Sequence, residues 1–254
     1  MYLGGPPVVG LSLEDDVRVE KTPPSHSRGR QLAQTSAEMI ANMVPVFGGT
    51  IAVALTVALN HKLNKRRERW FTELAEVVEE LRDRFEGFDP ESLAENEAFV
   101  DAVVTATRIV DRTSQREKIE ALRNAVLNSA LPAAPDQDIQ QLYFALIDDL
   151  TPTHLRLLTL LDDPPGWFDA RPGLHRPQFG MSSSRTALIN AAMPNLADKG
   201  PQMIERFYAA LTDGGLVNGA LGGMMTGQGA WQPVTTEFAA RFLAFIRDPR
   251  LSDT

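Results

Sequence analysis

Residues 50–85 read TIAVALTVALNHKLNKRRERWFTELAEVVEELRDRF, and this stretch decides the fold class. Its large apolar side chains recur mostly in steps of three and four residues, which is the spacing that places side chains on one face of an α-helix. A glycine, an aspartate and a proline follow at 87–90 and end the pattern. We therefore predict one long helix, whose apolar stripe contains Leu55, Leu59, Leu63, Trp70, Leu74, Val78, Leu81 and Phe85.

The same periodicity continues on both sides of this helix. A helical pattern starts at Gln31, and further helices are expected over residues 91–113, 115–131 and 136–150. Residues 1–30 contain prolines and glycines and no sustained pattern, so we expect a disordered tail there. We predict an all-α helical domain over residues 31–150, held together by the apolar faces of its helices.

The pattern changes in residues 151–254. We expect a short helix that stops at Asp163, a loop over 164–181, a helix from the N-capping serines 182–184 to Leu196, and a helix over 201–213. A strand, a glycine-rich turn, a second strand and a closing helix are expected to follow. The passages LTDGGLV (211–217) and VTTEFAARFLAFI (234–246) resemble winged-helix domains, with Glu237 where a glycine commonly stands. The expected fold is mainly α: an N-terminal helical array and a winged-helix-like C-terminal module with a short β-hairpin.

The winged-helix resemblance implies two contact elements. The recognition helix would be 201–213, with Gln202, Arg206 and Tyr208 as its contact residues, and the wing would carry Met224, Met225 and Trp231. Base readout and phosphate contacts usually need several basic residues. The recognition helix has one basic residue against two acidic ones, and residues 218–231 carry no charge. A protein partner is therefore expected for this module, and nucleic acid is not.

Three further passages resemble a family of uncharacterised bacterial proteins. They are KRRERW (65–70), ENEAFVDAVVTATRIVDRTSQREKIEALRNAVLNSAL (95–131) and IDDLTPTHLRLLTLLDDP (147–164). The resemblance covers about residues 45–165 and implies a bacterial, helical protein in two parts. It implies no activity and no catalytic residue.

An uncharged segment precedes a short basic run. Residues 39–60 contain no charged side chain, a length that suffices to cross a bilayer core, although their proline, glycines and asparagines oppose insertion. Gly48, Ala52 and Thr56 lie four residues apart, as in small-residue seams between close helices. The basic run then fits an anionic membrane surface at about 1 kcal/mol per residue. We call it the basic collar; its residues are Lys62, Lys65, Arg66, Arg67 and Arg69.

Three interpretations of the apolar segment 44–60 remain open at this point. It is the buried core of a helical array, a membrane-directed segment, or the seam of a homo-oligomer. The unbroken stripe from Leu55 to Phe85 favours the buried core. The collar favours the membrane.

Composition limits the remaining function classes. The chain has 254 residues, of which 43% are hydrophobic, a net charge of −8 and no cysteine. Disulfides and thiolate metal sites are therefore excluded. No phosphate-binding loop, dinucleotide fingerprint, H-E-x-x-H or G-x-S-x-G motif occurs. We therefore expect no catalytic residue, no metal site and no cofactor.

The sequence thus favours a non-enzymatic bacterial interaction protein whose winged-helix module contacts a protein partner. A winged-helix DNA-binding transcriptional regulator is one alternative. A membrane-acting effector with a releasable apolar helix is another. The expected location is the cytoplasm, with a position peripheral to or anchored at the inner membrane as the alternative.

Overall fold

The structure is a computed structural model that describes residues 49–84 and 92–251, with only the backbone described for residues 49–54, 84 and 94. The expected tail over residues 1–30, the helical pattern that starts at Gln31, and Gly48 lie outside the described residues. Residues Asn60–Thr254 form one compact unit, and residues up to Leu59 belong to a second. The predicted boundary at residue 150 thus lies inside the larger unit.

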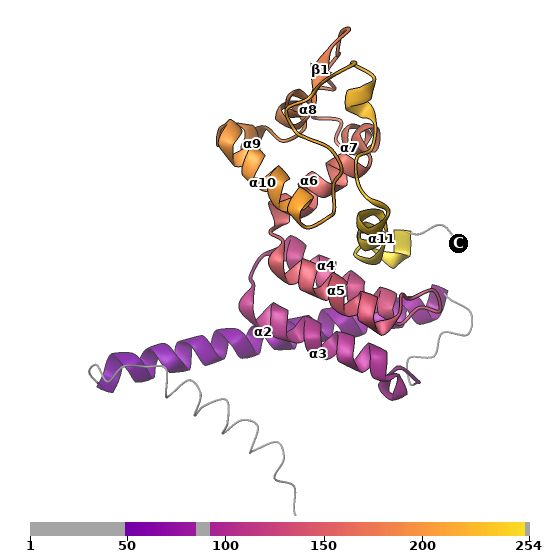
Figure 1. Cartoon of the computed structure of the whole chain (residues 1–254). Coiled ribbons are helices and arrows are strands. Elements are labelled where there is room, and N and C mark those ends of the chain that lie inside the picture. Colours follow the sequence, from indigo (N-terminus) through magenta and orange to yellow (C-terminus); the bar gives the residue numbers. More distant parts are fainter. Residues whose placement is uncertain (1–48, 85–91, 252–254) are drawn as a thin grey trace, which may run out of the picture. The chain divides into compact units, whose positions relative to one another are not determined.

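The described chain is mainly helical, with one small antiparallel sheet (Figure 1). The first part contains α2 (Gly49–Arg84), η1 (Ser92–Glu95), α3 (Glu97–Arg112), α4 (Arg116–Ser129) and α5 (Gln137–Asp149). The middle part contains α6 (Pro152–Asp162), α7 (Pro164–Asp169), β1 (Ser183–Ser184), α8 (Arg185–Ala192) and α9 (Pro194–Ala197). The last part contains α10 (Pro201–Asp213), β2 (Met224–Met225), η2 (Gly229–Trp231), α11 (Glu237–Phe245) and η3 (Pro249–Leu251).

Local sequence signals set most helix boundaries. The side chains of Asn96, Asp136, Ser184 and Thr236 each accept a hydrogen bond from the backbone N–H three residues later, at the starts of α3, α5, α8 and α11. Helix α10 ends in a Schellman motif, in which the N–H of Leu216 donates to the carbonyl of Leu211. This motif needs a left-handed residue, which Gly215 supplies with φ +67°.

Two expected boundaries were wrong. The loop expected over 164–181 begins with α7, because proline is favoured in the first turn of a helix and Asp163 caps the N–H of Gly166 at 3.0 Å. The single helix expected up to Leu196 is divided into α8 and α9. The break falls at Met193, because the ring of Pro194 disfavours the helical conformation of the residue before it.

The small sheet also differs from the expected hairpin. Strand β1 pairs antiparallel with β2 in the register Ser183↔Met225 and Ser184↔Met224, so β2 lies within the expected turn. The two segments expected as strands meet in one antiparallel bridge, Val217↔Thr235. Within the described residues, these two segments form no ladder longer than this bridge.

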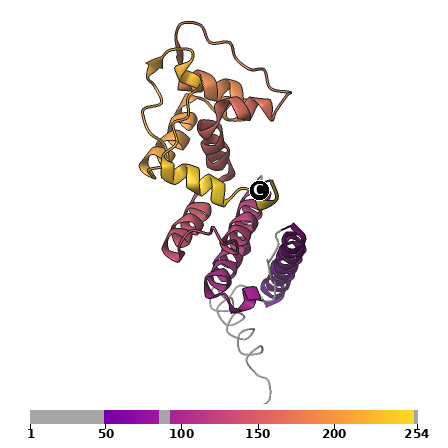
Figure 2. The ribbon, with the colours of Figure 1, turned by 90° about the vertical axis from the view of Figure 1, so that its right-hand side faces the viewer.

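One hydrophobic core runs through the larger unit. It includes Trp70 and Leu81 of α2, Ile147 of α5, Leu158 of α6 and Phe242 of α11, all at least 99% buried. Helix α11 packs on both α4 and α6, and Figure 2 shows it between the earlier helices and the later ones. Helix α11 therefore joins the helices before residue 150 to those after it.

Candidate functional site

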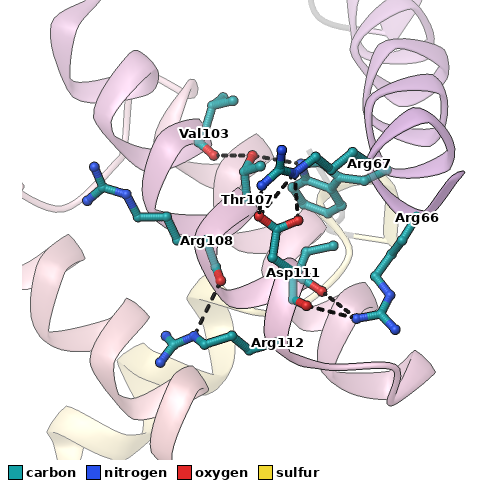
Figure 3. Close-up of polar contacts among 9 residues, drawn as sticks. Arg66, Arg67, Val103, Thr107, Arg108, Asp111 and Arg112 are labelled. Atoms are coloured by element: carbon teal, nitrogen blue, oxygen red, sulfur yellow. Dashed lines mark hydrogen bonds and ion pairs between the residues drawn. The ribbon is translucent and has the colours of Figure 1, made fainter. Parts of the chain in front are cut away.

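The basic collar lies where α2 packs against α3. Trp70 is 1% exposed, and its Nε1 donates a hydrogen bond to Oγ1 of Thr107 at 3.1 Å. The Thr107 hydroxyl in turn donates to the carbonyl oxygen of Val103 at 2.7 Å (Figure 3). The buried ring of Trp70, whose N–H is hydrogen-bonded, thus anchors α2 to α3 one residue after the collar.

Two collar arginines bind the end of α3. Arg66 Nη1 donates to the carbonyl oxygens of Val110 and Asp111, at 3.3 and 3.0 Å. A helix C-terminus carries unpaired carbonyls and partial negative charge, so a guanidinium is stabilising there. Arg67 forms a two-pronged ion pair with the carboxylate of Asp111 (Figure 3). Hydrogen bonding to Asp111 raises the pKa of the Arg67 guanidinium. Through these contacts, both arginines attach α2 to α3.

The rest of the collar opens onto a cleft of about 640 Å³ between α2, the end of α3 and the start of α4. Lys62, Lys65 and Arg69 are exposed, and none of them forms an ion pair with a residue that the structure describes. Two arginines of α4, Arg116 and Arg123, face them across the cleft. We call this surface the basic cleft; its lining is Lys62, Lys65, Arg66, Arg69, Trp70, Glu73, Val110, Ser114, Arg116, Ile119, Glu120 and Arg123.

Sequence reasoning missed the α4 side of this cleft. Arg116 and Arg123 are seven residues apart, which places them two turns apart on one helix face. That spacing was a usable signal, but a charged helix face is usually just solvated. Only the packing of α2 against α3 and α4 brings these arginines opposite the collar.

The N-terminal part of α2 exposes large apolar side chains. Leu55, Val57 and Leu59 are 57%, 63% and 49% exposed. These three side chains of segment 44–60 lack the burial that the buried-core interpretation expects, because a helical stripe in sequence does not guarantee a packing partner. Of the predicted seam, Thr56 is half-buried, and Gly48 and the side chain of Ala52 lie outside the described residues. No described helix is both long enough and apolar enough to cross a membrane.

The predicted recognition helix, α10, presents only part of its expected face. Gln202 and Arg206 are exposed. Tyr208 is 3% exposed, and its hydroxyl donates to the carbonyl oxygen of Gly219 at 3.3 Å. The prediction of Tyr208 as a contact residue is therefore wrong: it is three to four residues from Ile204 and Leu211 and shares their buried face.

The predicted wing residues also divide into exposed and packed groups. Met224 is 86% exposed, whereas Met225 is half-buried in the pairing with β1. Trp231 packs against Phe168 and Phe179 at centroid distances of 5.5 Å, so it has a structural role. Met181, which sequence reasoning left out, is 97% exposed and lies two residues before β1.

Comparison with known protein families, with curated proteins and with solved structures finds no match for this chain.

Proposed function

We propose that this chain is a non-enzymatic interaction protein that attaches reversibly to an anionic membrane surface through α2. The observation that supports it is the exposure of Leu55, Val57 and Leu59 directly before a basic collar in the sequence. An apolar helix segment followed by basic residues can lie in the membrane interface without spanning the bilayer.

Magnitudes favour weak, peripheral attachment. The three unpaired collar residues Lys62, Lys65 and Arg69 would contribute about 3 kcal/mol together, at about 1 kcal/mol each. Apolar side chains that are already half-exposed would add a few kcal/mol by leaving water. The sum suits reversible binding, since about 4 kcal/mol corresponds to a dissociation constant near 1 mM and about 8 to one near 1 μM.

Vesicle flotation tests this proposal. The chain should float with vesicles that contain phosphatidylglycerol and remain unbound with neutral phosphatidylcholine, and added salt should weaken its binding. The double variant Leu55→Asp/Leu59→Asp should lose most of the bound fraction. Leu142→Asp, at a leucine of α5 that is 53% exposed, is the matched control and should bind normally. Absence of binding at low salt, or normal binding by the double variant, would overturn the proposal.

The effector with a releasable apolar helix is a less favoured alternative. Such an effector needs its apolar helix covered at rest, and Leu55, Val57 and Leu59 of this segment are exposed.

For the C-terminal module we propose a winged-helix-like arrangement that contacts a protein partner. The order α6, β1, α8, α10 and then two paired segments is compatible with that fold. Met181, two residues before β1, and Met224 of β2 are both highly exposed, and exposed methionines are adaptable contacts for protein surfaces. The uncharged wing disfavours the DNA-binding alternative.

A photo-crosslinking residue at position 224 tests the module. In the cell of origin it should yield a discrete adduct with one protein, which can be a second copy of this chain. The same residue at the exposed Leu251 is the control. No adduct at either 224 or 181, together with salt-dependent binding to random duplex DNA, would favour the regulator instead.

A further inference from the structure

The basic cleft gathers cations from two helices that are far apart in sequence. Six of its twelve lining residues are basic and two, Glu73 and Glu120, are acidic, so the lining carries 6 − 2 = +4. The whole chain carries −8. Repulsion among gathered cations costs free energy, and this local positive charge in an acidic protein therefore favours a bound anion.

Few of these cations are neutralised within the described chain. Arg116 pairs with Glu120 at 2.9 Å, and Arg66 is occupied by the carbonyls of α3. Lys62, Lys65 and Arg69 have no ion pair with any described residue. They keep their hydrogen-bond donors available for a ligand.

Arg123 provides an independent indication. Its Nε is buried and has no hydrogen-bond partner among the described residues. Asp248 is close enough for the charge of Arg123 to lower its pKa, but that carboxylate is already bound by Arg250 at 2.7 Å. A buried, unpaired guanidinium nitrogen is costly. An anion in the cleft would accept from the other N–H groups of this guanidinium and stabilise its charge.

The start of α4 adds to the positive electrostatic potential of the cleft. Ser114 and Arg116 line the cleft, and the N-cap residue Gln115 makes no side-chain capping hydrogen bond within the described chain. The N–H groups and the positive end of the helix dipole favour an anion at this place.

We propose that the basic cleft binds a phosphate-bearing ligand, with a phosphate monoester or pyrophosphate group held by Lys62, Lys65, Arg69 and Arg123. A lining charge of +4 suits a polyvalent anion better than a single carboxylate, and guanidinium groups match phosphate oxygens in two-pronged geometry. Val110 and Ile119 supply an apolar wall for the organic part. A cleft of about 640 Å³ also has the usual size of a small-molecule site. This inference goes beyond membrane attachment and does not depend on it.

Calorimetric titration with inorganic pyrophosphate tests the cleft directly. We expect saturable binding of one pyrophosphate per chain, weakened at least about tenfold in Lys65→Gln/Arg69→Gln and in Arg123→Gln, as loss of charge-assisted hydrogen bonds implies. Lys199→Gln/Arg206→Gln removes two exposed charges elsewhere and should bind within about twofold of the original chain. Lys65 and Arg69 are exposed and form no ion pair within the described chain, so that double variant should fold normally, which circular dichroism checks.

Vesicles distinguish the two sources of phosphate. If the ligand is a lipid headgroup, the chain should prefer phosphatidic acid to phosphatidylglycerol at equal charge, and pyrophosphate should release it. If the ligand is a soluble phosphate compound, pyrophosphate should bind without that preference. No saturable pyrophosphate binding at low ionic strength, or equal binding by Lys65→Gln/Arg69→Gln, would overturn the cleft while leaving membrane attachment intact.

Discussion

Tyr208 illustrates how a polar side chain predicted for recognition can be structural. It is 3% exposed, and burial raises the pKa of its phenol, so the hydroxyl stays protonated and donates to Gly219. Gly219 has φ +83° and lies at the start of the wing. The bond thus connects α10 to a loop with few other anchors.

Tyr208→Phe should lower the free energy of unfolding by at most about 1 kcal/mol, because the hydroxyl's hydrogen bond to the carbonyl oxygen of Gly219 is lost while the ring still fills the core. Urea denaturation measures this. Arg206→Ala, at an exposed neighbour on α10, should change stability by less than about 0.5 kcal/mol. Equal stability of Tyr208→Phe and the original chain would indicate that the hydroxyl is free for a partner.

His154 acts at the same scale by capping α6. Its Nδ1 accepts from the backbone N–H of Thr151 at 3.2 Å, so the ring must be neutral at that nitrogen. Its ring lies 4.5 Å from that of Phe207, and burial lowers the pKa of the imidazole below its ordinary value of 6.5. The structure thus gives this histidine a role in capping α6.

This lowered pKa makes stability fall in acid. The unfolded chain binds the proton more tightly, so the contribution of His154 is complete above the unfolded pKa and is lost as the pH falls through the folded pKa. His154→Gln keeps an acceptor for the cap but does not titrate. The stability of the original chain should therefore fall relative to that of His154→Gln as the pH is lowered from about 7.5 to about 5. A pH-independent difference would contradict this assignment.

At the level of elements, α2 shows what an apolar stripe can and cannot establish. The predicted helix is confirmed, and so is burial of the stripe at Trp70, Leu74 and Leu81. Leu55 and Leu59 continue the same spacing and are exposed. Periodicity gives the face of a helix, but the presence of a neighbour on that face depends on tertiary packing.

Trp70→Ala should destabilise the larger unit by about 3–5 kcal/mol, the usual cost of removing a large buried aromatic side chain. Phe71→Ala is its neighbour on α2 and the matched control, since Phe71 is 47% exposed and should change stability by less than about 1 kcal/mol. Thermal and urea denaturation compare the two. Similar losses for both would mean that α2 does not pack on α3 through its Trp70 face.

The wing offers a second comparison at this scale. A Cβ at Gly227 would lie 2.3 Å from the carbonyl oxygen of Gly180, whereas a Cβ at Gly223 meets nothing within 4 Å. Gly227→Ala should therefore displace the β1–β2 region and lower stability by about 1–3 kcal/mol, as overpacking does. Gly223→Ala should be nearly neutral. Calorimetric melting temperatures separate the two results, and equal melting temperatures would contradict the close approach of these segments.

The difference between local sequence signals and tertiary packing explains which parts of the candidate site were predictable. The collar could be recognised in sequence because its five residues are adjacent in the chain. The sequence could not show which collar residues bind α3 and which remain unpaired. That depends on Arg66 and Arg67 binding Val110 and Asp111, more than forty residues later. Caps such as Ser184 and helix starts such as Pro201 were predictable because their signals are local.

At the level of the whole molecule, the C-terminal segment connects elements that the sequence separates. Asn128 Nδ2 donates to the carbonyl oxygens of Phe245 and Arg247, at 2.8 and 2.9 Å. Tyr143 of α5 lies 5.6 and 5.2 Å from the rings of Phe242 and Phe245. The helices before residue 150 thus share aromatic core and hydrogen bonds with α11, far along the chain.

This shared core predicts cooperative unfolding of residues 60–254. Transitions followed by tryptophan fluorescence and by far-ultraviolet circular dichroism should coincide, because coincident probes are the test of a two-state transition. Phe242→Ala should shift both by about 3–5 kcal/mol, since the side chain is fully buried where α11 meets α4 and α6. If the predicted boundary at residue 150 instead separates two independently folding domains, the transitions should separate. Only the transition of the domain that contains α11 would then shift fully in Phe242→Ala. An interface between independent domains transmits little of the stability lost in one of them.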